Sequence, residues 1–128
     1  MQRTSINPWP WSLNYGFSQA VLIEGHRREL ICSGQTVTDA DGHPQHAGDM
    51  RNQISMALDN LEAILIEAEM TFANISHLNI YTIDVDETLK HFDVLGARLG
   101  VTPAMTLLGV TRLAFLELMI ELEATAVD

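Results

Sequence analysis

The sequence predicts an α+β domain in which two helices back a six-stranded, largely antiparallel sheet. Apolar residues recur every three or four positions in residues 50–68 and again in 89–99, which is typical of helices with one buried face. Residues 117–126 instead alternate apolar and polar side chains, which is typical of a strand with one buried face. We expect the chain to run as two strands, a helix, a strand, a helix and two strands.

Length and composition indicate one globular domain, residues 1–128. A chain of this length can bury a substantial core, and 47% hydrophobic with 19% charged residues is the balance of a folded protein. The net charge is −10, and the largest basic cluster is the pair Arg27-Arg28. Because a surface that follows phosphates needs a basic stripe, we do not expect nucleic acid as a partner.

Three features of the sequence bear on its compartment. The first residues, MQRTSINPWPWS, lack the apolar core of a signal peptide. No segment approaches the ~20 apolar residues of a membrane span, so we expect no membrane partner. Cys32 is the single cysteine, which excludes an internal disulfide and fits a reducing compartment. We therefore expect a cytoplasmic protein.

The N-terminal residues 1–16 are expected to form an irregular arm. Two prolines and Gly16 interrupt this segment, and both kinds of residue break regular structure. The indoles of Trp9 and Trp11 stand between these residues, and we expect them to lie on the body of the domain.

A β-hairpin is predicted next. Residues 18–23 and 29–33 each have the composition of a strand, and Gly25-His26 between them is a turn signal. Residues 39–42, Asp-Ala-Asp-Gly, form a second turn signal.

No metal site is predicted at this turn or in the residues that follow it. Asp39 and Asp41 suggest a calcium loop, but the 12-residue ligand pattern that ends in Glu is missing. His43 and His46 lie close in sequence, but zinc needs further ligands in a defined geometry. We expect a solvated loop.

The two helices have recognisable ends. Asp49 stands in the N-cap position of the first helix, residues 50–68. Asp86 is expected to cap the second helix, and Gly100 to end it. Residues 77–85, which are rich in β-branched side chains, form the strand between the helices.

Two strands, residues 104–113 and 118–127, are expected to close the chain. In the last of them Glu117, Glu121 and Glu123 point to one face, whereas aliphatic side chains point to the other. A strand face with three carboxylates is either exposed to solvent or lines a polar cleft, and both alternatives stay open.

Apolar residues on both faces of two strands predict self-association. Residues 78–83 and 105–110 carry large apolar or aromatic groups on each side. Two helices can cover only one face of the sheet, and the chain has no element left for the other. Association with further copies would cover it and would create clefts between subunits where ligands can bind.

Four short motifs carry a resemblance to a known family. In this order and spacing they resemble the reactive-intermediate deaminase family (Rid, also called YjgF), and the resemblance runs from about residue 14 to residue 128. The motifs are Phe17-Ser-Gln-Ala20, Cys32-Ser-Gly-Gln35, Ala57-Leu-Asp-Asn-Leu61 and Glu121-Leu-Glu-Ala-Thr-Ala126.

The resemblance implies a chorismate-mutase-like fold, assembled as a homotrimer with a ligand cleft at each subunit interface. It implies hydrolysis of enamine or imine intermediates to a keto acid and ammonia, without a metal or an organic cofactor. Some members carry an endoribonuclease label. We do not expect this activity here, because the net charge of this chain is −10 and RNA is a polyanion.

The resemblance also assigns site residues. Glu123 matches the carboxylate that activates water in the family, and Ser33 with Gly34 matches a segment that lines the cleft. Structural alternatives stay open, since Glu123 has the pattern of an exposed strand acid and Ser33 that of a strand-end hydroxyl. Ser33 has no histidine placed to activate it, so serine hydrolase chemistry is not expected.

Three positions depart from the family pattern. Met105 stands where active deaminases have the arginine that binds the substrate carboxylate, and a thioether cannot form that bidentate pair. Phe17 stands where tyrosine is common, and Leu107 where cysteine is frequent. These three residues are expected either to pack in the core or to form an apolar wall of the ligand pocket.

Another arginine is not expected to replace the missing one within the same subunit. Arg112 lies seven residues beyond Met105, and the odd spacing points it to the other face of the predicted strand. Its expected role is structural. A neighbouring subunit could supply a cation from Arg3, Arg27, Arg28 or Arg51.

Two functions therefore remain open. One is a divergent enzyme that hydrolyses small imines or enamines, with Glu123 activating water. The other is a metabolite-binding or regulatory trimer that has lost the chemistry, which Met105 favours.

Overall fold

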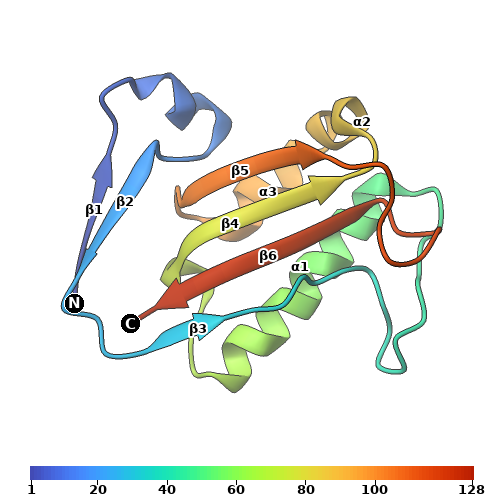
Figure 1. Ribbon diagram of the computed structural model, residues 1–128, viewed down its shortest axis with the longest axis horizontal. Coiled ribbons are helices and arrows are strands. Elements are labelled where there is room, and N and C mark those ends of the chain that lie inside the picture. Colours follow the sequence, from blue (N-terminus) through green and yellow to red (C-terminus); the bar gives the residue numbers. More distant parts are fainter.

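Six strands form two separate sheets (Figure 1). The computed structural model describes residues 1–128. The smaller sheet pairs β1 (Gln2–Ile6) with β2 (Ala20–Glu24) in antiparallel orientation. The larger sheet has the order β3-β6-β4-β5, with bounds Glu29–Ile31, Ile120–Val127, Ile75–Thr82 and Ala104–Gly109. The α+β class is confirmed, and the prediction of one six-stranded sheet is wrong.

The predicted pairing of the first strands is also wrong, because β2 pairs with β1 and β3 pairs with β6. The expected arm contains β1 and the 3₁₀ helix η1 (Pro10–Tyr15), so it is not irregular. Its two prolines limit regular structure only after Ile6, which leaves room for one short strand. Strand pairing in the larger sheet is antiparallel except between β4 and β5, which confirms a largely antiparallel arrangement.

Helix α1 (Met50–Glu67) begins where the sequence predicts. The Asp49 carboxylate accepts a hydrogen bond from the Asn52 amide at 3.1 Å, which is the geometry of an N-cap. The buried stripe of α1 packs against β6 and consists of Met50, Ile54, Ala57, Leu58, Leu61 and Leu65.

The second predicted helix is broken in two. Helix α2 (Val85–Lys90) is capped by Asp84 rather than Asp86, and α3 (Phe92–Leu99) follows after His91. The His91 backbone (φ −115°, ψ 17°) is not helical. The Thr88 hydroxyl donates to the Asp84 carbonyl at 2.8 Å, and this kind of bond to the preceding turn bends helices. Gly100 ends α3 in the left-handed conformation, as predicted.

The helices α1 and α3 cover the same face of the larger sheet (Figure 1). On β6 the side chains of Ile120, Leu122, Ala124 and Ala126 are buried on this face, which confirms the predicted alternation. The opposite face of the sheet carries no helix, and we call it the open face. No helix is long and apolar enough to cross a membrane.

The last strands are shorter than predicted. β5 ends at Gly109, and residues 110–119 form a connection before β6. Arg112 therefore lies outside the strand, and the argument from strand spacing does not apply to it. Its guanidinium donates to the backbone carbonyls of Leu113 and Ala114 at 3.2 and 3.4 Å, in keeping with a structural role.

Candidate functional site

A hydrogen-bonded carboxylate occupies the middle of the open face. Glu123 on β6 accepts hydrogen bonds at one oxygen, Oε1, from the Asn79 amide and the Tyr81 hydroxyl, each at 3.0 Å. Both donors come from the neighbouring strand β4, where Asn79 is the direct cross-strand partner of Glu123. These two bonds lower the pKa of Glu123, first through Asn79 and then through Tyr81, so the ionised form is favoured.

A second carboxylate, Glu121, lies on the same face but in different surroundings. No protein hydrogen bond to its side chain exists in this structure. Burial, and after it the negative charge of Glu123, raises the pKa of Glu121. The strand therefore holds two carboxylates whose pKa values are shifted in opposite directions, which is a common arrangement for acid–base chemistry.

Gly34 makes room for the Glu121 side chain. A methyl group at residue 34 would collide with the carboxyl group of Glu121. The segment around Gly34 continues beside β6, since the Cys32 amide donates to Ala124 and the Gln35 amide to Leu122, at 2.9 and 2.7 Å.

A β-bulge places Ser33 and Gly34 over the carboxylates. Residue 32 is hydrogen-bonded to residue 124, and residue 35 to residue 122. The first segment therefore has one more residue between these bonds than β6 has, which defines a bulge. Ser33 is exposed at this bulge. The predicted residues Ser33, Gly34 and Glu123 are thus close together on the open face.

The other predicted residues line an apolar pocket on the helix-covered face. Its volume is about 300 Å³, and all of its lining residues are hydrophobic. It contains Phe17, Met105 and Leu107 together with Trp11, Tyr15, Leu89 and Phe92. We call it the apolar pocket.

Ser18 holds Phe17 in the apolar pocket. The Ser18 amide donates to the Pro103 carbonyl at 3.0 Å, and its hydroxyl is 3.1 Å from that of Thr102. These contacts attach the segment after η1 to the start of β5. The Trp11 ring meets the Phe17 ring edge-on, with centroids 5.8 Å apart.

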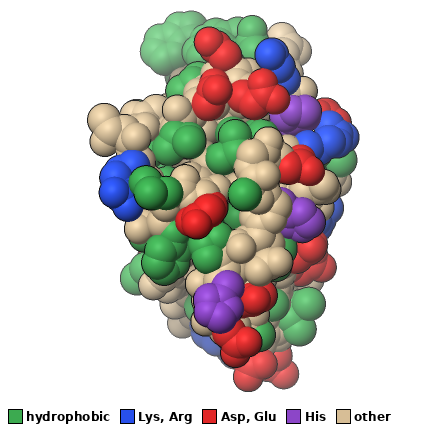
Figure 2. Space-filling model, turned by 90° about the vertical axis from the view of Figure 1, so that its right-hand side faces the viewer, with side chains coloured by type: hydrophobic (Ala, Val, Ile, Leu, Met, Phe, Trp, Pro, Cys, Tyr) green, Lys and Arg blue, Asp and Glu red, His purple; other side chains and the backbone are tan.

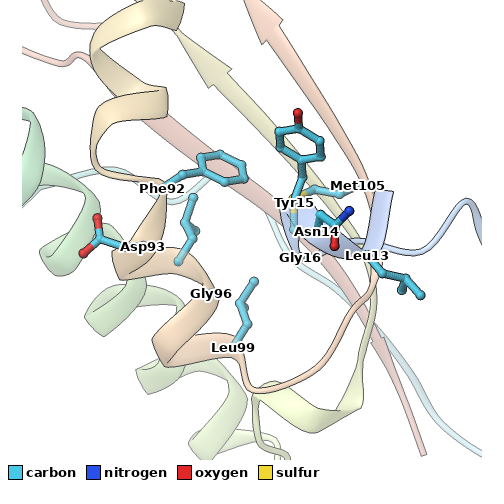
Figure 3. A pocket seen from close by; sticks show the side chains of 10 residues that line it. Leu13, Asn14, Tyr15, Gly16, Phe92, Asp93, Gly96, Leu99 and Met105 are labelled. Atoms are coloured by element: carbon cyan, nitrogen blue, oxygen red, sulfur yellow. The ribbon is translucent and has the colours of Figure 1, made fainter. Parts of the chain in front are cut away.

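A second cavity, of about 350 Å³, adjoins the apolar pocket and shares Tyr15, Phe92 and Met105 with it. Figure 3 shows the Phe92 and Tyr15 rings on opposite sides of this cavity, with Met105 beside Tyr15. Asp93 points away from the cavity, toward α1 (Figure 3). There it forms an ion pair with Arg51 at 2.9 Å.

The two groups of predicted residues lie on opposite faces of the sheet. In the register of β4 and β5, Met105 pairs with Leu78 and Leu107 with Ile80, both of which belong to the core under the helices. Glu123 instead pairs with Asn79 on the open face. Met105 and Glu123 of one chain therefore cannot line one cleft.

No cation of this chain lies beside Met105 in the apolar pocket. The apolar pocket contains no basic residue. Arg3 donates to the Ala73 carbonyl at 3.0 Å, Arg28 pairs with Asp128, and Arg51 pairs with Asp93. Arg27 is the one arginine without a side-chain hydrogen bond or ion pair in this structure.

The turn at residues 39–43 brings three potential metal ligands together. Side-chain atoms of Asp39, Asp41 and His43 lie within 4.8 Å of one another. The Asp39 carboxylate, however, accepts the backbone amides of residues 41 and 43 at 3.0 and 2.9 Å. These bonds explain the cluster as a turn that the aspartate stabilises.

Sequence reasoning missed several residues of both groups. Asn79 and Tyr81 alternate on β4 and so share a face with Glu123, a signal that the strand pattern contained. Trp11 and Tyr15 recur at helical spacing before Phe17, but the prolines suggested irregular structure. Leu89 and Phe92 belong to the predicted apolar stripe of residues 89–99. Both line the pocket, and Phe92 also packs against the core.

The comparison with known proteins decides the family. A family model described as endoribonuclease L-PSP matches residues 12–128. A Rid-family protein of unknown function from Yersinia pestis, called YyfB, has 34% sequence identity and a TM-score of 0.89, with 100% of both chains covered. The chain belongs to the Rid/YjgF family. The resemblance carried by the four sequence motifs is confirmed.

Other relatives of this Rid/YjgF-family protein are more distant. A RutC family protein from Pyrococcus abyssi is 27% identical over 111 residues, which is 86% of this chain and 84% of the relative. A member of the conserved YjgF/YER057c/UK114 family from Mycobacterium tuberculosis is 26% identical with a TM-score of 0.68, covering 99% of this chain and 100% of the other.

Proposed function

We propose that this Rid/YjgF-family protein hydrolyses small imines or enamines to a carbonyl compound and ammonia, in clefts between the subunits of a homotrimer. The observation that supports this proposal is the pair of carboxylates on the open face, Glu121 and Glu123, whose pKa values are shifted in opposite directions. Such a pair offers one group that is held ionised and one whose protonated form is favoured, so that it can carry a proton.

Hydrolysis of the protonated imine needs only water and a proton shuttle. A carboxylate removes a proton from water, whose oxygen bonds to the imine carbon while the C=N π electrons move to nitrogen. The same carboxyl group then returns the proton to nitrogen. As the C–N bond breaks, the hydroxyl oxygen forms the C=O bond, and its proton passes through the carboxylate to the departing ammonia, which leaves as ammonium. The balance is R₂C=NH₂⁺ + H₂O → R₂C=O + NH₄⁺. The reaction requires no cofactor.

Glu121 is better suited than Glu123 to move this proton. Its oxygens have no protein hydrogen bond, and its raised pKa lets the group both accept and donate a proton. Glu123 is held at Oε1 by Asn79 and Tyr81. We propose that Glu123 stays ionised, keeps the pKa of Glu121 raised by its charge and stabilises the iminium cation.

The homotrimer is proposed on two grounds. The open face exposes apolar side chains on two strands, with Ile31 77% and Leu108 50% exposed, and association would remove them from water. In addition, Met105 and the two glutamates face opposite sides of the sheet, so only neighbouring subunits can bring an apolar pocket and a carboxylate pair together. In this proposal the substrate contacts two subunits. One subunit contributes Phe17, Met105 and Leu107, and the next contributes Ser33 and Gly34.

Cleavage of RNA, which the name of the matching family model suggests, has less support. A polyanion needs a basic surface, and this chain has a net charge of −10. On the face that Figure 2 shows, Lys and Arg side chains stand apart among acidic and neutral ones and form no stripe.

A metabolite-binding trimer without catalysis is the second candidate. Met105 in place of an arginine favours it, because a carboxylate-bearing intermediate would find no bidentate partner in the pocket.

Imine decay measured in the presence of the protein distinguishes the two candidates. An amino-acid oxidase or an amine oxidase generates the imine, and its disappearance is followed with and without catalytic amounts of this protein. We expect acceleration that Glu121→Gln reduces by about 10²- to 10⁴-fold and that Glu123→Gln also reduces. No acceleration with imines from either source would leave the binding function.

A further inference from the structure

We infer that the apolar pocket selects substrates without a carboxylate: imines or enamines of simple amines that carry an uncharged aryl or branched alkyl group. This inference rests on the proposed function, because it names the substrate class of the proposed cleft. It concerns the pocket residues of one chain, so binding tests it without any catalysis.

The lining of the pocket carries the inference. Four of the lining residues are aromatic and three are aliphatic or contain a thioether. They are Trp11, Tyr15, Phe17 and Phe92, and Leu89, Met105 and Leu107. The volume of about 300 Å³ fits a single ring or a branched alkyl chain with the reacting carbon. A carboxylate placed here would lose part of its water and would find no basic side chain to pair with, which is costly.

The charged residues around the pocket also disfavour an anionic ligand. Arg51 on α1 is already paired with Asp93, whose side chain points away from the cavity (Figure 3). Lys90 follows Leu89 in sequence but pairs with Glu87 at 3.3 Å. An anionic ligand would therefore enter a site without a free cation, in a chain of net charge −10.

A protonated imine suits the same surroundings. A cation close to the faces of aromatic rings is attracted by them, and each aromatic wall of the pocket offers such a surface. In the proposed trimer the positive C=N group would point to the glutamates of the neighbouring subunit, while the apolar group fills the pocket. Recognition would then depend on shape and on a single positive charge.

A matched pair of product analogues tests the inference. The uncharged probe is 4-phenylbutan-2-one, and the anionic probe is 2-oxo-4-phenylbutanoate, which carries a carboxylate in place of the terminal methyl group. Trp11 reports binding by fluorescence after Trp9→Phe removes the only other indole. We expect the uncharged ketone to bind about tenfold more tightly or better.

Variants make the test specific. Met105→Arg should reverse the preference between the two probes. Leu89→Arg is a second variant at the pocket rim, where the native side chain is 48% exposed and a long polar residue can be accommodated. Ile66→Arg, on the exposed side of α1, adds the same charge elsewhere and should leave the preference unchanged.

The outcomes separate this inference from the proposed function. Tighter binding of the anion, or equal binding of both probes, would overturn the selectivity. If the protein prefers the ketone but accelerates the decay of no imine, the selectivity of the pocket is supported and the proposed hydrolysis is rejected. Faster hydrolysis of imines from amino acids than of imines from amines would support the enzyme and reject the selectivity.

Discussion

Glu121 and Glu123 stand two residues apart on one face of β6 and have different surroundings. Two donors from β4 hold Glu123, whereas Glu121 lies half-buried beside Gly34 with no hydrogen-bond donor. The difference is set by neighbours that come from distant parts of the chain. For this reason the sequence pattern placed both acids on one face but did not distinguish their roles.

The raised pKa of Glu121 predicts a characteristic dependence of stability on pH. Between its unfolded and folded pKa values the native state binds more protons than the unfolded state, so this group makes stability fall as pH rises above about 4.5. Glu121→Gln removes this contribution. We expect the stability of the variant relative to the native protein to increase as pH rises above about 4.5.

Urea unfolding at a fixed protein concentration measures this difference at each pH. A stability advantage of the glutamine variant that shrinks as pH rises would show that the Glu121 carboxylate is stabilised, not penalised, in the folded protein.

Gly34→Ala is predicted to reduce activity through Glu121. The added methyl group collides with atoms of a flexible side chain and not with backbone, so the fold should survive while the carboxyl group is displaced. A displacement of about 1 Å can cost about 10²-fold in rate. Imine decay measures the loss, and circular dichroism checks the fold.

A double variant gives the control for this prediction. If residue 34 acts only through Glu121, the alanine should have little further effect in the Glu121→Gln background. A full additional loss there would mean that Gly34 acts by another route.

Among the elements, α1 was the most predictable and the two N-terminal strands the least. The apolar period and the Asp49 cap are local signals, and both define the start of α1. β2 pairs with β1, and β3 pairs with β6, whose partner residues are more than 90 positions away in the sequence. Local turn signals at Gly25 cannot determine such partners, which is why a hairpin was wrongly predicted.

Gln53 is predicted to hold α1 against the start of β6. Its buried side chain donates to the Glu117 carbonyl and accepts from the Met119 amide, each at 2.8 Å. Gln53→Leu leaves these two backbone groups without partners, and we expect a loss of about 2–4 kcal/mol in the free energy of unfolding. Chemical denaturation measures it.

Gln53→Glu keeps an acceptor for the Met119 amide but places a buried carboxylate oxygen against the Glu117 carbonyl, so we expect it to be destabilised as well. If the leucine variant is as stable as the native protein, these bonds do not fasten α1 to β6.

At the scale of the whole molecule, the open face predicts association. Apolar strand residues Ile31 and Leu108 are exposed there, and helices cover only the other face. We expect light scattering to give a trimer mass. Ile31→Lys or Leu108→Lys should raise the concentration at which the trimer dissociates by about tenfold or more, since each would bury a charge at the interface.

Ile66→Lys, on the exposed side of α1, should leave the mass unchanged. A monomer at micromolar concentration, or equal effects of lysine on both sides of the molecule, would contradict the proposed assembly.

The two-face geometry was beyond the reach of the sequence. Met105, Leu107 and Phe17 were expected either to pack in the core or to form a wall of the ligand pocket, and the sequence did not show on which face of the sheet they lie relative to Glu123. The register of β5 on β4 directs Met105 toward the helices, and this register is set by pairing that no local pattern reveals.

Subunit complementation tests the shared cleft most directly. Glu121→Gln removes the proton shuttle, and Leu89→Trp fills the apolar pocket from its exposed rim. Each variant alone should be inactive toward imines. After the two are unfolded together and refolded at equal amounts, one subunit can supply an intact pocket and the next an intact carboxylate. Random mixing then gives about one quarter native clefts, so we expect about one quarter of the native activity. Activity that stays at the level of the separate variants would contradict a site shared between subunits.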